Sequence, residues 1–349
     1  MKKILFIDNQ QFGSLTDSFK YCEILKDKYD ITYLCFDKGL EKQSIKGVKV
    51  KYVSYSGNKS LRGIRFLLRA IFEAGIFHGF IFVIYFEKFQ LIKRALPWKK
   101  MHVDIRTLCV NKDEKIRKRI DCKIKEAIEV FDTASAISQG VIDKIGSGKK
   151  IYLLPLGADA ISSSNKRFDN LRLLYVGTLN NRDIIKTVKG FKKYIDLFPT
   201  MDVKYDIVGD GEEYNDIVEY IANENIGELV KCHGRVPHSQ LGQYFDRCNI
   251  GVSFVPMTDY YENQPPTKTF EYAFSGMFTI ATRTQANQEI ITPQNGLLIG
   301  DNSDDFAQSL DVIWKNRDDI NSIIIRKSVE NYSWENIVNQ YLEPIIQGV

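Results

Sequence analysis

A lysine and a glutamate three residues apart, just after two prolines, are the side chains whose types and spacing best suit chemistry. Residues 263–276 read Asn-Gln-Pro-Pro-Thr-Lys-Thr-Phe-Glu-Tyr-Ala-Phe-Ser-Gly. The prolines block a helix upstream, Thr267 can cap a helix, and Gly276 suits the residue just past a helix end. The pattern predicts a short helix between Thr267 and Gly276, followed by a strand over 277–281.

The start of this predicted helix suits an anion. Its unpaired backbone N–H groups and the positive end of its dipole face outward, and Lys268 adds a full charge. Glu271 lies in the first turn, where it can accept hydrogen bonds from hydroxyl groups attached to the anion. A sugar phosphate fits both features. The alternative is that Glu271 only interacts favourably with the positive end of the helix dipole. A capping box does not explain Glu271, because it would need Ser or Thr at position 268, which is Lys.

Length and composition describe a globular chain with room for two domains. The 349 residues can form two cores, and the six cysteines show neither Cys-x-x-Cys pairing nor a histidine at metal-ligand spacing, which indicates a reduced, cytoplasmic protein. The apolar run after Lys3 ends at Asp8, which favours a first strand over a signal peptide. The most apolar segment, 70–86, contains Glu73 and falls short of the roughly 20 residues of a membrane-spanning helix.

Charge is divided unevenly along the chain. Residues 1–165 hold 30 Lys and Arg against 18 Asp and Glu, a net of +12, whereas residues 166–349 hold 18 against 26, a net of −8. A basic first half points to an anionic surface or substrate. Nucleic acid is not the expected partner, because no helix-turn-helix, RNP-like or zinc-finger pattern is present.

A candidate membrane-facing helix lies in the basic half. Arg62, Arg65 and Arg69 fall on one face of a predicted helix over 60–77, among leucine, isoleucine and phenylalanine. Such a basic amphipathic helix can lie on an anionic bilayer, and the basic, aromatic turn over 97–100 suits lipid headgroups. The alternative is an ordinary solvated helix face.

Strands and helices alternate in both halves, which predicts two Rossmann-like units. A strand over 3–8 leads through a loop with Gly13 into a helix, and the series restarts with a strand over 171–176 after a polar linker at 162–169. Asp104 and Arg106 follow a further strand of the first half. Because loops at the carboxyl ends of such strands face the ligand, both are candidate acceptor-side groups.

The motif Pro-x-Lys-x-x-Glu-Tyr-x-x-x-Gly over 266–276 resembles the donor site of glycosyltransferase family 4, whose members are retaining and use nucleotide sugars. The resemblance covers nearly the whole chain, tightly over 171–300 and loosely before 150. It implies an α/β protein of GT-B fold, with two Rossmann-like doubly wound domains facing across a cleft. Residues 1–160 would form the acceptor domain and 161–331 the donor domain, with a helix over 332–349 packing back on the first.

The resemblance also implies roles for single residues. Glu271 would hold the ribose hydroxyls, while Asn263 stands where many members have a second glutamate facing the transferred sugar. Thr178 replaces the first of the family's two diphosphate-binding cations, and Arg182 lies one position from the second, with Lys186 a weaker substitute. The resulting catalytic set is Glu271, Lys268, Arg182, Asp104 and Arg106. The donor site would further include Gly13, Gly177, Gly209, Gly211, Asn263, Thr267 and Thr269.

These residues imply a metal-independent transferase without a cofactor, because the chain has no Asp-x-Asp pair to hold Mg²⁺ or Mn²⁺. The expected donor is a UDP- or GDP-sugar. The expected acceptor is a saccharide, free or linked to polyprenyl diphosphate, at the inner face of an anionic membrane, in the synthesis of a bacterial surface polysaccharide or glycan. Two alternatives stay open: a nucleotide-sugar 2-epimerase of the same fold, and a non-catalytic sugar-nucleotide binding protein.

Overall fold

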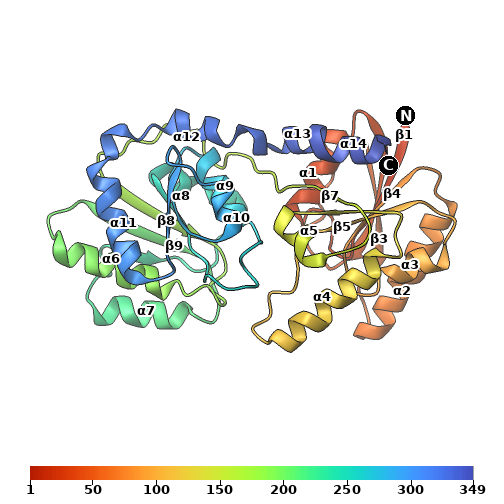
Figure 1. Cartoon of the computed structure of the whole chain (residues 1–349), viewed down its shortest axis with the longest axis horizontal. Coiled ribbons are helices and arrows are strands. Elements are labelled where there is room, and N and C mark those ends of the chain that lie inside the picture. The colour runs from red at the N-terminus through yellow and green to blue at the C-terminus, as the bar shows by residue number, and fades with distance from the viewer. Residues whose placement is uncertain (349) are drawn as a thin grey trace. The chain divides into compact units, whose positions relative to one another are not determined.

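The computed structural model describes residues 1–348, which form two compact units (Figure 1). The first unit comprises Met1–Leu156 together with the segment that starts at Trp334, and the second comprises Gly157–Ser333. The sequence placed the corresponding boundaries at 160 and 331. Each unit is a parallel sheet covered by the helices that connect its strands.

The first unit is built on a seven-stranded sheet in the order β3-β2-β1-β4-β5-β6-β7. All of its paired strands run parallel, so each connection must cross over the sheet. The central strands are continuous apolar runs because helices cover both of their faces. The strands are β1 (Lys2–Ile7), β2 (Tyr29–Asp37), β3 (Val48–Ser54), β4 (Phe80–Ile84), β5 (Met101–Ile105), β6 (Thr133–Ala136) and β7 (Ile151–Leu153).

Helices of the first unit come from both ends of the chain. The C-terminal segment packs on α1, where the Trp334 ring meets the edge of Tyr21 at 5.9 Å and Glu343 pairs with Lys28 at 2.8 Å. The helices are α1 (Thr16–Leu25), α2 (Lys59–Ile76), α3 (Gln90–Ala95), α4 (Glu114–Ile128), α5 (Gln139–Ile145), α13 (Trp334–Ile337) and α14 (Glu343–Gly348), the last two joined by a π-helical turn (Val338–Leu342).

The second unit repeats the same winding with six parallel strands, in the order β10-β9-β8-β11-β12-β13. Each sheet thus reverses its strand order beside its first strand, β1 or β8, and ligands bind doubly wound sheets at such a point. The strands are β8 (Leu171–Val176), β9 (Val203–Val208), β10 (Val230–Cys232), β11 (Ile250–Ser253), β12 (Phe278–Thr282) and β13 (Gly296–Ile299).

Two helices of the second unit, α6 and α11, lie side by side in contact (Figure 1). Gly190 of α6 permits this approach, because a Cβ there would lie 2.5 Å from the Ser303 carbonyl oxygen. The helices are α6 (Ile185–Leu197), α7 (Tyr214–Asn223), α8 (Gly242–Arg247), α9 (Thr267–Phe274), α10 (Gln285–Gln288), α11 (Ser303–Lys315) and α12 (Ser322–Ser328), with 3₁₀ turns at His238–Gln240, Arg317–Asp319 and Glu330–Tyr332.

Candidate functional site

Helix α9 forms where the two prolines and Gly276 predict it. At its end the Gly276 N–H donates to Ala273 and the Met277 N–H to Tyr272, while Gly276 adopts a φ of +73° that favours glycine. Its start corrects one expectation. Pro266 occupies the cap position and Thr267 is the first helical residue, so Thr267 is not the cap. The proline supplies the extended approach but no side-chain acceptor.

Lys268 points from the first turn of α9 into the protein. Its Nζ is buried 3.7 Å from the centre of the Tyr175 ring and makes no hydrogen bond within residues 1–348. Burial lowers the pKa of this amine well below its usual value, the positive charge of Arg182 lowers it further, and Glu271 opposes both. Burial therefore works against the full positive charge expected from the sequence, and an anion bound beside the amine would favour the charged form.

Arg182 is the second cation of this cluster. Its guanidinium lies over the Tyr261 ring, 4.4 Å from the ring centre, and its Nη1 is buried without a hydrogen bond to any described residue. The loop that carries it is fixed by Glu213, whose carboxylate accepts the backbone N–H groups of residues 182, 183 and 184 at 2.8, 3.2 and 3.0 Å. These N–H groups are thus already bonded, and the two side-chain cations remain for an anion.

Glycines at the ends of β8 and β9 bring the backbone close to the cations. A Cβ on Gly177, whose φ is +151°, would lie 2.8 Å from the Lys268 Nζ. A Cβ on Gly209 would lie 1.8 Å from the Gly177 carbonyl oxygen, and one on Gly211 would lie 2.6 Å from the Asn180 side chain. Larger side chains would therefore displace Lys268 or separate the two loops.

Glu271 lies one turn after Lys268 and completes the cluster. Burial raises the pKa of its carboxyl to about 7, and the nearby Lys268 limits the rise. The carboxyl can therefore be protonated or ionised near neutral pH. In either state it can accept hydrogen bonds from hydroxyl groups. Two buried cations beside such a carboxyl suit a diphosphate that carries a polyhydroxyl group.

Other predicted donor-site residues have different positions. Asn263 is buried in the loop before α9. Thr269 turns toward the sheet, where its hydroxyl bonds to Ser253 at 2.6 Å and to Asn287 at 3.1 Å, so this side chain holds α9 to β11 rather than facing the cations. Lys186, the weaker substitute, pairs with Asp183 at 2.9 Å, which leaves the cluster with Arg182 and Lys268.

The predicted acceptor-side residues lie in the first unit, around a cavity of about 280 Å³. Arg106 forms an ion pair with Asp17 at 2.5 Å and donates to the Leu154 carbonyl oxygen at 2.8 Å. Asp104, fully buried, accepts from Ser135 at 2.6 Å through Oδ1, while its Oδ2 makes no hydrogen bond in the described part of the chain. Asp8, after β1, lines the same cavity.

Burial raises the pKa of both Asp8 and Asp104 to about 6. A hydrogen bond from Tyr33 limits the rise at Asp8, and the Arg106 charge limits it at Asp104. Three carboxyl groups against one guanidinium make this cavity a set of acceptors for hydroxyl or ammonium hydrogens. It does not suit a phosphate.

Sequence reasoning missed Asp8, Asp17, Tyr175 and Glu213. Asp8 follows a strand just as Asp104 ends one, so the same rule about strand ends could have identified it. No local pattern places the other three at a site, because their site partners are distant in the sequence. Gly13, predicted as a donor-loop glycine, has a φ of +90° and lies against Gln43 in the first unit. Gly13, Asp104 and Arg106 therefore belong to one unit, and the remaining predicted residues to the other.

Known protein families and solved structures resemble this chain in sequence or in fold. Residues 170–316 match the model of the family described as Glycosyl transferases group 1. No curated protein sequence matches the chain. Among solved structures, sucrose-phosphate synthase from Thermosynechococcus elongatus has a TM-score of 0.76 at 16% identity, with 97% of each chain covered.

Two further structures are similar over nearly the full length. Alr3699/HepE from Anabaena, in complex with UDP and glucose, has a TM-score of 0.74 at 14% identity, with 99% of each chain covered. The lipopolysaccharide outer core galactosyltransferase WaaB has a TM-score of 0.71 at 17% identity, covering 98% of this chain and 99% of that one. The predicted GT-B fold of two Rossmann-like domains is confirmed, and so is the prediction that this chain is a glycosyltransferase.

Proposed function

We propose that this glycosyltransferase is a retaining, metal-independent enzyme of family 4 that moves a sugar from a UDP- or GDP-sugar to a saccharide acceptor. The observation that carries the donor assignment is the pair of buried nitrogens, Lys268 Nζ and Arg182 Nη1, neither of which makes a hydrogen bond within residues 1–348. Both lie in the segment that matches the family model. A similar fold binds UDP and glucose in Anabaena Alr3699/HepE, which supports a nucleotide-sugar donor.

In the proposed reaction the acceptor oxygen bonds to the anomeric carbon while the bond from that carbon to the diphosphate breaks. Negative charge develops on the leaving nucleotide, where Lys268 and Arg182 stabilise it, and the acceptor proton passes to the leaving phosphate. Glu271 holds the ribose hydroxyls. The Lys268 amine is shielded from water, so its attraction to the diphosphate is screened less than it would be at the surface. Metal independence and retention are part of the proposal and follow from the absent Asp-x-Asp pair and the family resemblance.

The acceptor saccharide binds the cavity around Asp104 and Arg106. Its carboxyl groups accept hydrogens from sugar hydroxyls, and the Arg106 guanidinium orients Asp17 across the cavity. The proposed acceptor is linked to polyprenyl diphosphate at the inner face of a membrane, where the enzyme is peripheral. None of the described helices is both long enough and apolar enough to cross a bilayer.

The test incubates the protein with UDP-, GDP- and ADP-sugars, each with and without a membrane lipid extract, and measures released nucleotide. Release that depends on the extract supports the transferase. Conversion of the donor without an acceptor would identify the 2-epimerase, and donor binding without turnover would identify the binding protein. Thermal-shift measurements over the same donors identify the base, because a bound ligand stabilises the folded state.

A further inference from the structure

Helix α2 presents a row of large apolar side chains to the surface. Leu61, Ile64, Leu68, Phe72 and Ile76 follow one another at spacings of three or four residues, and each is between 55% and 64% exposed. We call these five residues the α2 ridge. The opposite face of the helix carries the buried side chains Phe66, Ala70 and Ala74. The ridge is thus a surplus of apolar surface beyond what the helix needs to pack on its own unit.

The arginines of α2 also have partners within the protein. The Arg62 guanidinium lies 4.1 Å from the centre of the Tyr55 ring, and Arg65 donates to the carbonyl oxygens of Ser54 and Ser56 at 3.0 and 3.1 Å. Arg69 pairs with Glu73 at 2.6 Å. The cations therefore flank the ridge and do not lie at its crest.

No acidic side chain opposes an anionic surface at this helix. Glu73 is the one acid within α2, and it is buried between Arg69 and Lys51, whose Nζ lies 2.5 Å away. The exposed charges of α2 are consequently all positive. Charge complementarity argues against a second copy of this chain as the occupant, because two ridges in contact would bring two rows of cations together.

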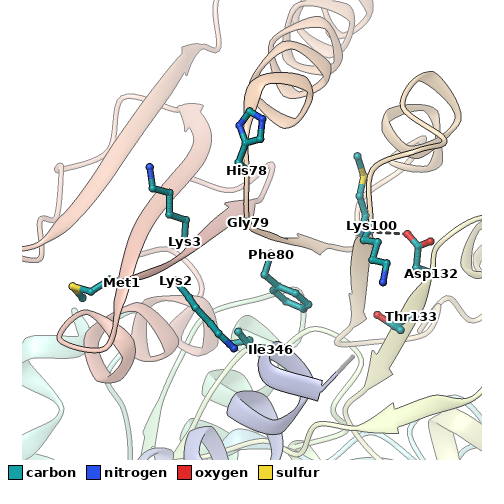
Figure 2. A pocket seen from close by; sticks show the side chains of 11 residues that line it. Met1, Lys2, Lys3, His78, Gly79, Phe80, Lys100, Asp132, Thr133 and Ile346 are labelled. Atoms are coloured by element: carbon teal, nitrogen blue, oxygen red, sulfur yellow. Dashed lines mark hydrogen bonds between the residues drawn. The ribbon is translucent and has the colours of Figure 1, made fainter.

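An exposed tryptophan and a basic cavity lie near the C-terminal end of α2. Trp98 is 72% exposed, and its neighbour Lys99 donates to the Phe77 carbonyl oxygen at 2.7 Å, which ties this turn to the end of α2. His78 and Lys100 then line a cavity of about 470 Å³ together with Lys2 and Lys3. Figure 2 shows Lys2 and Lys100 on opposite sides of Phe80.

The acid in this cavity is already engaged. Asp132 accepts the Met101 N–H at 2.8 Å and pairs with Lys93 at 2.7 Å. Lys3 pairs with Asp30 at 4.0 Å, and Asp132 does not neutralise the charges of Lys2 and Lys100.

We propose that the α2 ridge and Trp98 insert into the apolar layer of an anionic membrane, while the cavity in Figure 2 receives a lipid headgroup phosphate. This inference rests on the proposed membrane-linked acceptor and names the surface that reaches the membrane. Insertion of apolar side chains is not screened by salt, whereas attraction between headgroups and lysines is. Binding therefore has a salt-resistant part from the ridge and a salt-sensitive part from the cavity.

The experiment floats the full chain with phosphatidylcholine vesicles and with vesicles that also contain phosphatidylglycerol. The double variant Ile64→Glu and Leu68→Glu should lower binding to both by at least about tenfold, equivalent to about 1.4 kcal/mol. Leu197→Glu is the matched control, because Leu197 is a 72% exposed leucine of the second unit. The variant Lys2→Gln with Lys100→Gln should lower only the preference for phosphatidylglycerol, by several-fold.

Trp98 provides a direct reading of insertion. Its fluorescence should shift to the blue and be quenched by lipids with brominated chains, and Trp98→Phe should remove this change because Trp334 is buried and Trp314 partly so. Equal vesicle binding by the glutamate double variant and the parent protein would overturn the inference. A dimer in lipid-free solution that the same variant dissociates would overturn it in favour of a second copy. Donor-dependent thermal shifts measure the proposed function separately, since none of these residues belongs to the donor cluster.

Discussion

The two units share one strand order but carry opposite charge where their strands end. In each unit the charge of these site residues is also opposite in sign to the net charge of the corresponding half of the sequence. Residues 1–165 have a net charge of +12, yet the cavity beside β1 and β5 is lined by three aspartates and one arginine. Residues 166–349 have a net charge of −8, yet Lys268 at the start of α9 and Arg182 in the loop after β8 place two cationic side chains with buried nitrogens there.

This contrast separates two kinds of charge that a net count combines. Exposed charges dominate the count, whereas the few buried charges face a ligand and keep most of their strength. The basic character of the first half resides in features such as α2 and the cavity of Figure 2, rather than around Asp104. A lipid phosphate and an acceptor sugar would therefore bind at different places on the same unit.

The largest effect on donor binding is expected when a cationic side chain of the second unit is removed. Lys268→Met should weaken donor binding by about 100-fold, within the 2–5 kcal/mol typical for truncating one partner of a buried charge pair. The same change should stabilise the ligand-free protein by about 1 kcal/mol, because it replaces a desolvated amine with an apolar side chain. Calorimetry measures the first effect and thermal unfolding the second.

The matched control for Lys268 is Lys186→Met, which removes a lysine already paired with Asp183. It should leave donor affinity within a factor of about two, in line with the small worth of exposed ion pairs. Calorimetry in buffers of different ionisation enthalpy adds a second measurement: a bound diphosphate favours the charged form of Lys268, so any proton uptake that accompanies donor binding should be lost in Lys268→Met. If Lys268→Met bound every nucleotide sugar as tightly as the parent protein, the donor assignment would be lost.

The next effect concerns Glu271 and depends on pH. The folded-state pKa, about 7, lies above the ordinary value of 4.5, so the stability linked to this carboxyl is present below pH 4.5 and is lost as pH rises through 7. Glu271→Gln stays uncharged. The free energy of unfolding of this variant should equal that of the parent protein at low pH and exceed it above pH 7, by at most about 3 kcal/mol. Urea unfolding across this pH range measures the difference.

The same variant should weaken donor binding by about tenfold, because an amide replaces one of the two oxygens that accept ribose hydrogen bonds. A nucleotide sugar and its 2′,3′-dideoxy analogue give the decisive comparison. The parent protein should discriminate between the two ligands more strongly than Glu271→Gln does. Equal discrimination by the parent protein and Glu271→Gln would show that Glu271 interacts only with the helix dipole and not with the ribose.

A smaller effect is expected in the first unit. Asp104→Asn keeps an oxygen to accept from Ser135 but removes a carboxylate oxygen from the cavity. The KM for the acceptor should rise several-fold, while the donor dissociation constant stays unchanged because the donor cluster belongs to the other unit. Initial rates at saturating donor measure the first quantity and donor titration the second. A change in donor affinity alone would contradict the division of roles.

The sequence was sufficient where short-range patterns determine structure. Two prolines and a glycine located α9, and its turn brought Lys268 and Glu271 together. Burial of Lys268 against Tyr175 could not be predicted, because that contact joins residues distant in sequence. The α2 arginines were predicted to face an anionic bilayer, but the sequence could not show their partners within the fold, which are the carbonyl groups of 54 and 56 and the buried Glu73. The role of Asp17 could not be predicted either, because its ion-pair partner Arg106 is distant in the sequence.

The smallest effect is expected from a change at Glu213, which holds the backbone of the loop that carries Arg182. Glu213 accepts three backbone N–H groups, with Oε1 bonded to residues 182 and 183 and Oε2 to residue 184. In Glu213→Gln the amide oxygen can keep the bonds of Oε1, but an NH₂ group faces the third N–H. Stability should fall by about 1 kcal/mol, the usual net worth of one hydrogen bond.

Loosening this loop should also weaken donor binding several-fold, because Arg182 is positioned by the backbone that Glu213 holds. Glu212→Gln, at the exposed neighbouring position, is the control and should change neither property. A double variant with Arg182→Ala distinguishes positioning from direct contact. If Glu213 acts through Arg182, its loss should cost no further donor affinity once Arg182 is absent, whereas the loss of stability should persist.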